Sequence, residues 1–248
     1  MSSWLVGALC GLIGLFALGV PAGIRALPEP PLEELPEDPE DDTATQAMLR
    51  AEGPKEPYVD LAARPRLALW SALAAVLANG AIGVRLGDHP VTWVLALLMP
   101  VLILLAVVDW RTRLLPRVVV LPATGVLILL AGVEWLAERD THVLVRTLVA
   151  MLVARSFFWI LWFVRSAGMG FGDVRLAALL GLVLGRVGWN PWLIGLYGGL
   201  LLFGVFGITL TIVRRDRATL KKAYPFGPFM IAGALLGVLL GGSVHILG

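Results

Sequence analysis

Residues 91–108 read VTWVLALLMPVLILLAVV and contain no charged side chain. A helix of this length can cross the hydrocarbon core of a bilayer, which is about 30 Å thick. Similar apolar runs recur along the chain, and we predict spans at about residues 4–24, 67–86, 91–108, 117–137, 143–164, 174–188, 191–213 and 226–247. The sequence therefore predicts an all-α, polytopic integral membrane protein with about eight transmembrane helices.

The composition of the 248-residue chain leads to the same class. Hydrophobic residues make up 58% of the chain and charged residues 15%, and the mean hydropathy is +0.84. A soluble domain carries about 25% charged residues, so an ordinary soluble enzyme is excluded. The apolar runs are continuous rather than alternating, which also excludes a transmembrane β-barrel.

Acidic residues are concentrated in one segment near the amino terminus. Of the 18 Asp and Glu residues, 11 lie between Pro28 and Asp60, in a stretch that begins PEPPLEELPEDPEDD. This composition buries too little apolar surface to fold alone, so we expect a largely disordered loop that ends in a short interfacial helix before Pro65. The predicted parts of the chain are a first transmembrane helix (1–27), an acidic, Pro-rich cytoplasmic loop (28–66) and a seven-helix membrane core (67–248).

The Lys and Arg residues predict the orientation, because cytoplasmic segments of membrane proteins hold an excess of them. With the amino terminus outside, 15 of the 20 fall in cytoplasmic segments, whereas Arg85, Arg139 and Arg186 fall outside. We therefore predict a multi-pass protein whose N-terminus lies outside. The same bias explains the pI near 9.0 without a nucleic-acid partner.

Two carboxylates differ from the others in their position. Of the seven Asp and Glu residues outside the acidic segment, only Asp109 and Asp173 lie where a predicted span meets the cytoplasm. A carboxylate at membrane depth costs about 2.5–3.5 kcal/mol at a helix centre, so few are kept without a partner or a function. Ion pairs with Arg111 and Arg175 are one interpretation, and acid–base chemistry by the two aspartates is the other.

The sequence lacks the residues that a zinc site or a serine–histidine catalytic site would need. The chain has no HExxH motif for a zinc site, and Cys10, the single cysteine, lies inside the first predicted span. His89, His142 and His245 all map to the outer side, so no cytoplasmic Ser-His pair can form. We therefore predict no bound metal.

Two stretches that do not favour regular helix lie at the predicted cytoplasmic ends of transmembrane spans. Gly168, Gly170 and Gly172 precede Asp173 at alternate positions, and glycine permits backbone conformations and close approaches that other residues do not. The stretch YPFGPF, residues 224–229, opens the last predicted span. Non-helical backbone at membrane depth occurs only beside a cavity or inside protein, so both stretches are candidate parts of a site.

These stretches carry three motifs in order: DWRTRLLP (109–116), GMGFGDVRL (168–176) and PFGPF (225–229). The second contains the GxGD pattern of intramembrane aspartyl proteases at Gly170-Phe171-Gly172-Asp173. Together the motifs resemble those of the type IV prepilin peptidases, and the resemblance covers nearly the whole chain. It implies an aspartyl endopeptidase of the bacterial inner membrane that removes the leader peptide of type IV prepilins or pseudopilins at the cytoplasmic face, in pilus assembly or protein secretion.

The resemblance also implies roles for individual residues. It makes Asp109 and Asp173 the catalytic pair, in which one would take a proton from water and the other would donate to the scissile carbonyl oxygen. The implied substrate contacts are Gly168, Gly170, Gly172, Pro225, Phe226, Gly227 and Pro228. The implied partners are prepilin or pseudopilin leaders and the lipid bilayer, with no nucleic acid.

One departure from the family lies in the first cytoplasmic loop. Full-length members carry paired CxxC motifs there, which bind zinc in the region associated with N-methylation of the processed pilin. Residues 29–63 of this chain contain no cysteine. We therefore expect peptidase activity without a cofactor, and a need for S-adenosylmethionine only if methylation occurs.

Two interpretations from other classes stay open at this point. An ion- or proton-coupled transporter would use the two aspartates as a relay, but such proteins show internal repeats with matched broken helices, and the sequence shows none. The other is a structural component of pilus assembly without catalytic activity. Cleavage of a synthetic leader by the purified protein separates the three.

Overall fold

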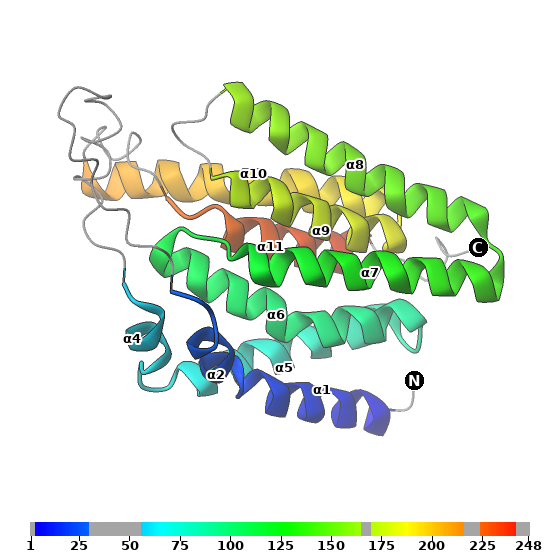
Figure 1. The fold of residues 1–248 in the computed structure, drawn as a ribbon, viewed down its shortest axis with the longest axis horizontal. Helices are drawn as coiled ribbons and strands as arrows, with labels where there is room; N and C mark the ends of the chain where they lie inside the picture. Colours follow the sequence, from blue (N-terminus) through cyan, green and yellow to red (C-terminus); the bar gives the residue numbers. More distant parts are fainter. Residues whose placement is uncertain (1–2, 30–55, 165–169, 216–223, 242–248) are drawn as a thin grey trace.

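The computed structural model describes residues 3–29, 56–164, 170–215 and 224–241, and every element within these ranges is helical. The elements are α1 (Ser3–Ala17), α2 (Val20–Arg25), α4 (Tyr58–Ala62), α5 (Leu67–Leu86), α6 (Pro90–Thr112), α7 (Arg117–Glu138), α8 (Thr141–Val164), α9 (Phe171–Val187), α10 (Trp189–Arg214), α11 (Gly227–Leu236) and a π-helical turn, η3 (Gly237–Gly241). The long helices run side by side in one bundle (Figure 1). The all-α prediction is confirmed.

Five of these helices are long and apolar enough to cross a membrane, namely α5, α6, α7, α8 and α10. They match the spans predicted at 67–86, 91–108, 117–137, 143–164 and 191–213. The remaining predictions correspond to shorter apolar helices at Cys10–Arg25 and Gly227–Gly241, and to α9, which has 17 residues. The fold is that of a helical membrane protein, and the count of eight spans stays a prediction.

The first predicted span, 4–24, is not one continuous helix. It is divided into α1 and α2 by a turn at Leu18 and Gly19. Pro21 lies in the first turn of α2, and proline has no N–H to bond the carbonyl four residues earlier and clashes with it. The hydropathy of the run hides this interruption, because proline among apolar residues changes the average little.

The short helix expected before Pro65 is present as α4. Its first two N–H groups, those of Tyr58 and Val59, donate to the carboxylate of Glu29 at 3.0 and 3.1 Å. A carboxylate is favourable at a helix start, where N–H groups lack partners within the helix. Glu29 therefore joins the two ends of the acidic loop, although most of that loop, residues 30–55, lies outside the described residues.

The most buried helix is α9, which contacts α6, α7, α8, α10 and α11. It approaches α8 closely because of two glycines. A Cβ added at Gly181 would lie 2.7 Å from the Cβ of Ala154, and one added at Gly185 would lie 2.4 Å from the Cβ of Ala150. Protein rather than lipid therefore surrounds α9, which positions the polar start of this helix inside the bundle.

The last residues of α9 lie at the end of the bundle opposite α4 (Figure 1). Charged side chains contact this end of the helix. Arg186 donates from Nε to Glu134 at 2.7 Å. Arg146 is buried in α8 and donates to the carbonyl oxygens of Gly185 and Arg186, at 3.0 and 3.2 Å. These arginine bonds satisfy carbonyl groups that a helix end leaves without partners.

Helices α10 and α11 approach each other closely at glycine residues, so a larger residue there should lower the stability of the protein. A Cβ at Gly233 would lie 2.3 Å from the backbone nitrogen of Gly199 and 2.7 Å from the carbonyl oxygen of Gly195. Backbone atoms cannot move aside, so we expect Gly233→Ala to lower the free energy of unfolding by about 1–3 kcal/mol. The measurement is the thermal unfolding midpoint of the purified protein.

The control is Gly204→Ala in α10, because a Cβ there meets nothing within 4 Å. Alanine is a better helix former than glycine, so the control should match or slightly exceed the parent midpoint. Equal midpoints for the two variants would show that the α10–α11 contact tolerates expansion.

Candidate active site

Asp109 lies in the last turn of α6, and its side chain is only 3% exposed. The helix ends because Arg113 adopts a left-handed conformation, with φ 55°, and donates its N–H to the carbonyl oxygen of Asp109 at 2.8 Å. Pro116 then precedes the first residue of α7. The motif at 109–116 is therefore a helix end, a tight turn and a helix start.

Asp173 lies in the first turn of α9, and its side chain is 6% exposed. Its N–H donates to the carbonyl oxygen of Gly170 at 3.1 Å, with Gly170 at the N-cap position. The two aspartates thus come from helices that run in opposite directions along the bundle. The end of α6 and the start of α9 lie at the same end of the bundle, toward the left of Figure 1, and the two carboxylates are close enough for their charges to interact.

The start of α11 also contacts one of the two aspartates. The N–H of Gly227, the first residue of α11, donates to Oδ2 of Asp109 at 2.9 Å, and the bond is buried. A Cβ at Gly227 would lie 2.8 Å from that oxygen and 3.2 Å from the carboxyl carbon. The sequence predicted Gly227 as a substrate contact, whereas the structure places its N–H against a predicted catalytic carboxylate.

Aromatic rings hold the segment that carries Gly227. Phe226 is buried, and its ring lies 5.6 Å from that of Phe158 in α8 and 5.0 Å from that of Phe203 in α10. Phe229 contacts Trp110, the neighbour of Asp109, at 6.1 Å between ring centroids. Edge and tilted ring contacts of this kind stabilise a fixed arrangement, so α11 starts in a defined position.

The glycines of the second motif differ in what they do. Gly172 faces Leu115, and an added Cβ would lie 2.8 Å from the Cβ of Leu115. Gly170 is exposed, and a side chain would fit there, because an added Cβ would lie 3.8 Å from Oδ2 of Asp173. Gly168 lies outside the described residues.

Neither Gly170 nor Gly172 has a backbone conformation that only glycine can adopt. Gly170 has φ −71°, and Gly172 lies within α9. Among the described glycines, positive φ occurs at Gly87 and Gly188 only. Gly172 therefore contributes space for a close approach rather than an unusual backbone conformation.

The ion pairs considered for the aspartates do not form as expected. Arg175 places its guanidinium 4.9 Å from the ring centroid of Phe171, and within the described part of the chain no salt bridge joins it to Asp173 or joins Arg111 to Asp109. Arg113 is the basic residue whose charge acts on Asp109. Salt bridges to Arg111 and Arg175 are therefore not the reason for these two buried acids.

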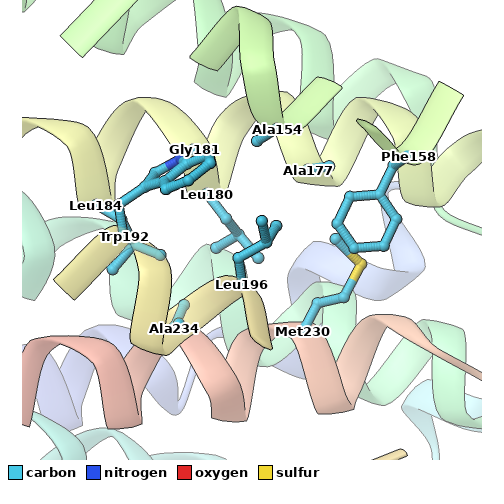
Figure 2. A pocket seen from close by; sticks show the side chains of 11 residues that line it. Ala154, Phe158, Ala177, Leu180, Gly181, Leu184, Trp192, Leu196, Met230 and Ala234 are labelled. Atoms are coloured by element: carbon cyan, nitrogen blue, oxygen red, sulfur yellow. The ribbon is translucent and has the colours of Figure 1, made fainter. Parts of the chain in front are cut away.

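An apolar pocket lies apart from the aspartates, between α8, α9, α10 and α11 (Figure 2). Ala154, Phe158 and Trp192 are among its lining residues, and neither Asp109 nor Asp173 is. The indole N–H of Trp192 is occupied by the carbonyl oxygen of Ala150 at 3.1 Å. The residues that line the pocket include no acid or base.

Comparison with known proteins shows which family the chain resembles. Residues 96–213, which include both aspartates, match the type IV leader peptidase family. Three curated proteins similar to the chain are each named prepilin leader peptidase/N-methyltransferase. The chain is 30% identical to that of Pseudomonas putida over 159 residues, or 63% of this chain and 50% of that protein.

The other two relatives are from Aeromonas. Identity to the Aeromonas salmonicida protein is 30% over 179 residues, or 71% of this chain and 52% of that protein. Identity to the Aeromonas hydrophila protein is 30% over 184 residues, or 73% of this chain and 59% of that protein. The chain thus spans about half the length of the curated relatives it matches. No solved structure matches it significantly.

Proposed function

We propose that the chain is a membrane-embedded aspartyl endopeptidase, because residues 96–213 match the type IV leader peptidase family. Its substrates would be type IV prepilins or pseudopilins, from which it removes the leader peptide at the cytoplasmic face of the bacterial inner membrane. The observation that carries the proposal is the meeting of Asp109 and Asp173, both buried, at one end of the bundle.

In the proposed mechanism the two carboxylates share one proton. The ionised aspartate takes a proton from water, and the resulting hydroxide attacks the scissile carbonyl carbon while the protonated aspartate donates to its oxygen. The tetrahedral intermediate then collapses and the C–N bond breaks. The first aspartate gives the proton it took from water to the leaving amine nitrogen, and the second takes a proton back from the hydroxyl as the new carboxyl group forms. Two interacting carboxyl groups titrate as a pair, so neither residue is assigned as base or acid. The N–H of Gly227 fixes the orientation of the Asp109 carboxylate during these transfers.

Substrate contacts are proposed on the basis of exposure. Among the residues that the sequence predicted to bind substrate, Gly170 is exposed and Pro228 is half-buried. Pro225, Phe226 and Gly227 are buried. We therefore place an extended leader segment beside Gly170 and Pro228, with the buried residues supporting α11.

The peptidase reaction as proposed needs no cofactor, because the two aspartates activate water by themselves. N-methylation of the processed pilin would require S-adenosylmethionine, and it is proposed only as a second activity to be tested. The curated relatives carry N-methyltransferase in their names, and this chain spans about half of their length.

Cleavage of a synthetic leader by the purified protein in detergent or nanodiscs tests the function. Product cut after the leader, formed equally with and without a strong chelator, is the expected result. Transport of protons or cations by the reconstituted protein, without any cleavage, would favour the relay interpretation instead. Loss of cleavage on chelation would contradict the metal-free mechanism.

The orientation gives a second, independent prediction. In a Cys10→Ser background, single cysteines at Asp88 and Asp140 should react with a membrane-impermeant thiol reagent added to intact cells, because both lie at the predicted outer end. A cysteine at the exposed Asp60 in α4 should react only after permeabilisation. The opposite pattern would place the two aspartates on the outer face and remove the proposed access to cytoplasmic leaders.

A further inference from the structure

Arg155 lies near the middle of α8, and its side chain is exposed. It is nine residues before Val164, the last residue of the helix, and nine residues after Arg146, which bonds the far end of α9. At 1.5 Å per residue each separation is about 14 Å, and the hydrocarbon core of a bilayer is about 30 Å thick. Arg155 is therefore near the centre of the membrane, on the outer surface of the bundle.

The guanidinium of Arg155 has no partner within the described part of the chain. No hydrogen bond, salt bridge or ring contact there involves it. Arg146 in the same helix shows the contrast, since it is buried and donates to two carbonyl oxygens of α9. An arginine at the centre of a transmembrane helix is costly, and such residues almost always pair. Arg155 thus lacks, among these residues, the partner that its depth requires.

The apolar pocket between α8, α9, α10 and α11 lies beside Arg155 along α8 (Figure 2). Ala154 and Phe158, one position before and three positions after Arg155, line the pocket from α8, and Leu196 lines it from α10. Leu196 is half-buried, so the pocket reaches the outer surface of the bundle. Helix α8 packs mainly on α9 and contacts α10 little. The result is an apolar groove between α8 and α10 with a positive charge beside it.

Charge distinguishes the molecules that could cover this groove. Lipid phosphates lie about 15 Å from the bilayer centre, and long basic side chains reach them from positions near helix ends. A second copy of the chain offers no acid at this depth, and two copies joined through α8 would bring their arginines together. The described acidic residues all lie toward the two ends of the bundle (Glu29, Glu56, Asp60, Asp88, Asp109, Glu134, Glu138, Asp140 and Asp173).

We propose that the groove between α8 and α10 binds a transmembrane helix of another protein, and that a carboxylate near the centre of that helix pairs with Arg155. Such a pair is stronger in a low dielectric than in water. Leu152 and Trp159 lie one turn before and one turn after Arg155, and they are 52% and 45% exposed. They contact the apolar side chains of the bound helix. The proposal does not depend on the proposed peptidase function.

The test uses the full chain in nanodiscs, with synthetic single-span peptides as probes. Each peptide is an apolar Leu-Ala helix with either Glu or Gln at its centre, so the two differ only in a carboxylate or an amide. A photoreactive amino acid at position 152 reports contact with α8. The control site is position 129 in the middle of α7, where Leu129 is 67% exposed.

The Glu peptide should cross-link from position 152 about three- to thirtyfold more than the Gln peptide, the range for polar contacts between membrane helices. Arg155→Leu should remove this difference, and Arg155→Lys should keep most of it because lysine retains the charge. Position 129 should show no difference between the peptides. Arg85→Leu, which removes an exposed arginine near the end of α5, should behave as the parent does.

Thermal unfolding of the same variants tests whether Arg155 is satisfied within the chain. Leucine is more favourable than arginine at the centre of a membrane helix, so Arg155→Leu should unfold at or above the parent midpoint. Arg146→Leu should unfold below it, because this change removes two hydrogen bonds to α9 and leaves the carbonyl groups without a partner.

Four outcomes would overturn the proposal. Equal cross-linking of the two peptides to the parent would favour lipid phosphate as the partner of Arg155. A preference for the Glu peptide that survives in Arg155→Leu would show that another residue recognises the carboxylate. Cross-links from position 152 that join two copies of the chain would make a second copy the occupant. A lowered midpoint in Arg155→Leu would show that the arginine has its partner within the chain.

Discussion

Replacing either Asp109 or Asp173 by asparagine is expected to reduce leader cleavage by about 10²- to 10⁴-fold, which is the usual contribution of a general acid or base. Asparagine keeps the shape of the side chain but can neither hold nor release the shared proton. The carboxylates are buried at 3% and 6% exposure, so bulk water cannot replace them. Single-turnover cleavage of a synthetic leader is the measurement, because it reports the chemical step.

The loss must be shown to be chemical rather than structural. Both variants should insert in the membrane and unfold at midpoints close to that of the parent, since an amide can also accept the N–H of Gly227. Asp88→Asn, at an exposed position just before the start of α6, is the matched control and should cleave normally. Near-normal turnover in either site variant would rule out an aspartyl mechanism that uses both residues.

Much of the fold follows from local features of the sequence. Apolar runs of sufficient length give the five long helices, because in lipid each backbone must satisfy its own hydrogen bonds. The meeting of Asp109 and Asp173 at one end also follows, since both lie at the ends of predicted spans on the same predicted side. The division between α1 and α2 was missed because the hydropathy average does not register the effect of Pro21.

The remaining features depend on contacts between distant residues. The donor to Asp109 is the backbone N–H of Gly227, and every residue except proline has such a group, so no side-chain pattern marks it. Arg186 and Glu134 form their ion pair between α9 and α7, and the sequence alone places them only on the same outer side.

The second large effect is expected at Gly227, where the structure leaves no room beside the carboxylate. In Gly227→Ala the new Cβ would lie 2.8 Å from Oδ2 of Asp109. The carboxylate or the start of α11 must then move, and the bond from the Gly227 N–H lengthens or breaks. Because a displacement of about 1 Å can cost about 10²-fold in rate, we expect kcat to fall by roughly that factor with a smaller change in KM.

Gly170→Ala distinguishes this geometric effect from a general intolerance of alanine near the site. A Cβ there would lie 3.8 Å from Oδ2 of Asp173, an ordinary contact, and the φ of −71° suits alanine. Its kcat should therefore stay close to that of the parent, and a raised KM would support the proposed substrate contact. Gly125→Ala in α7, where a Cβ meets nothing within 4 Å, should change neither parameter. If Gly227→Ala kept the parent kcat, the N–H of Gly227 could not be what holds Asp109 in its reactive orientation.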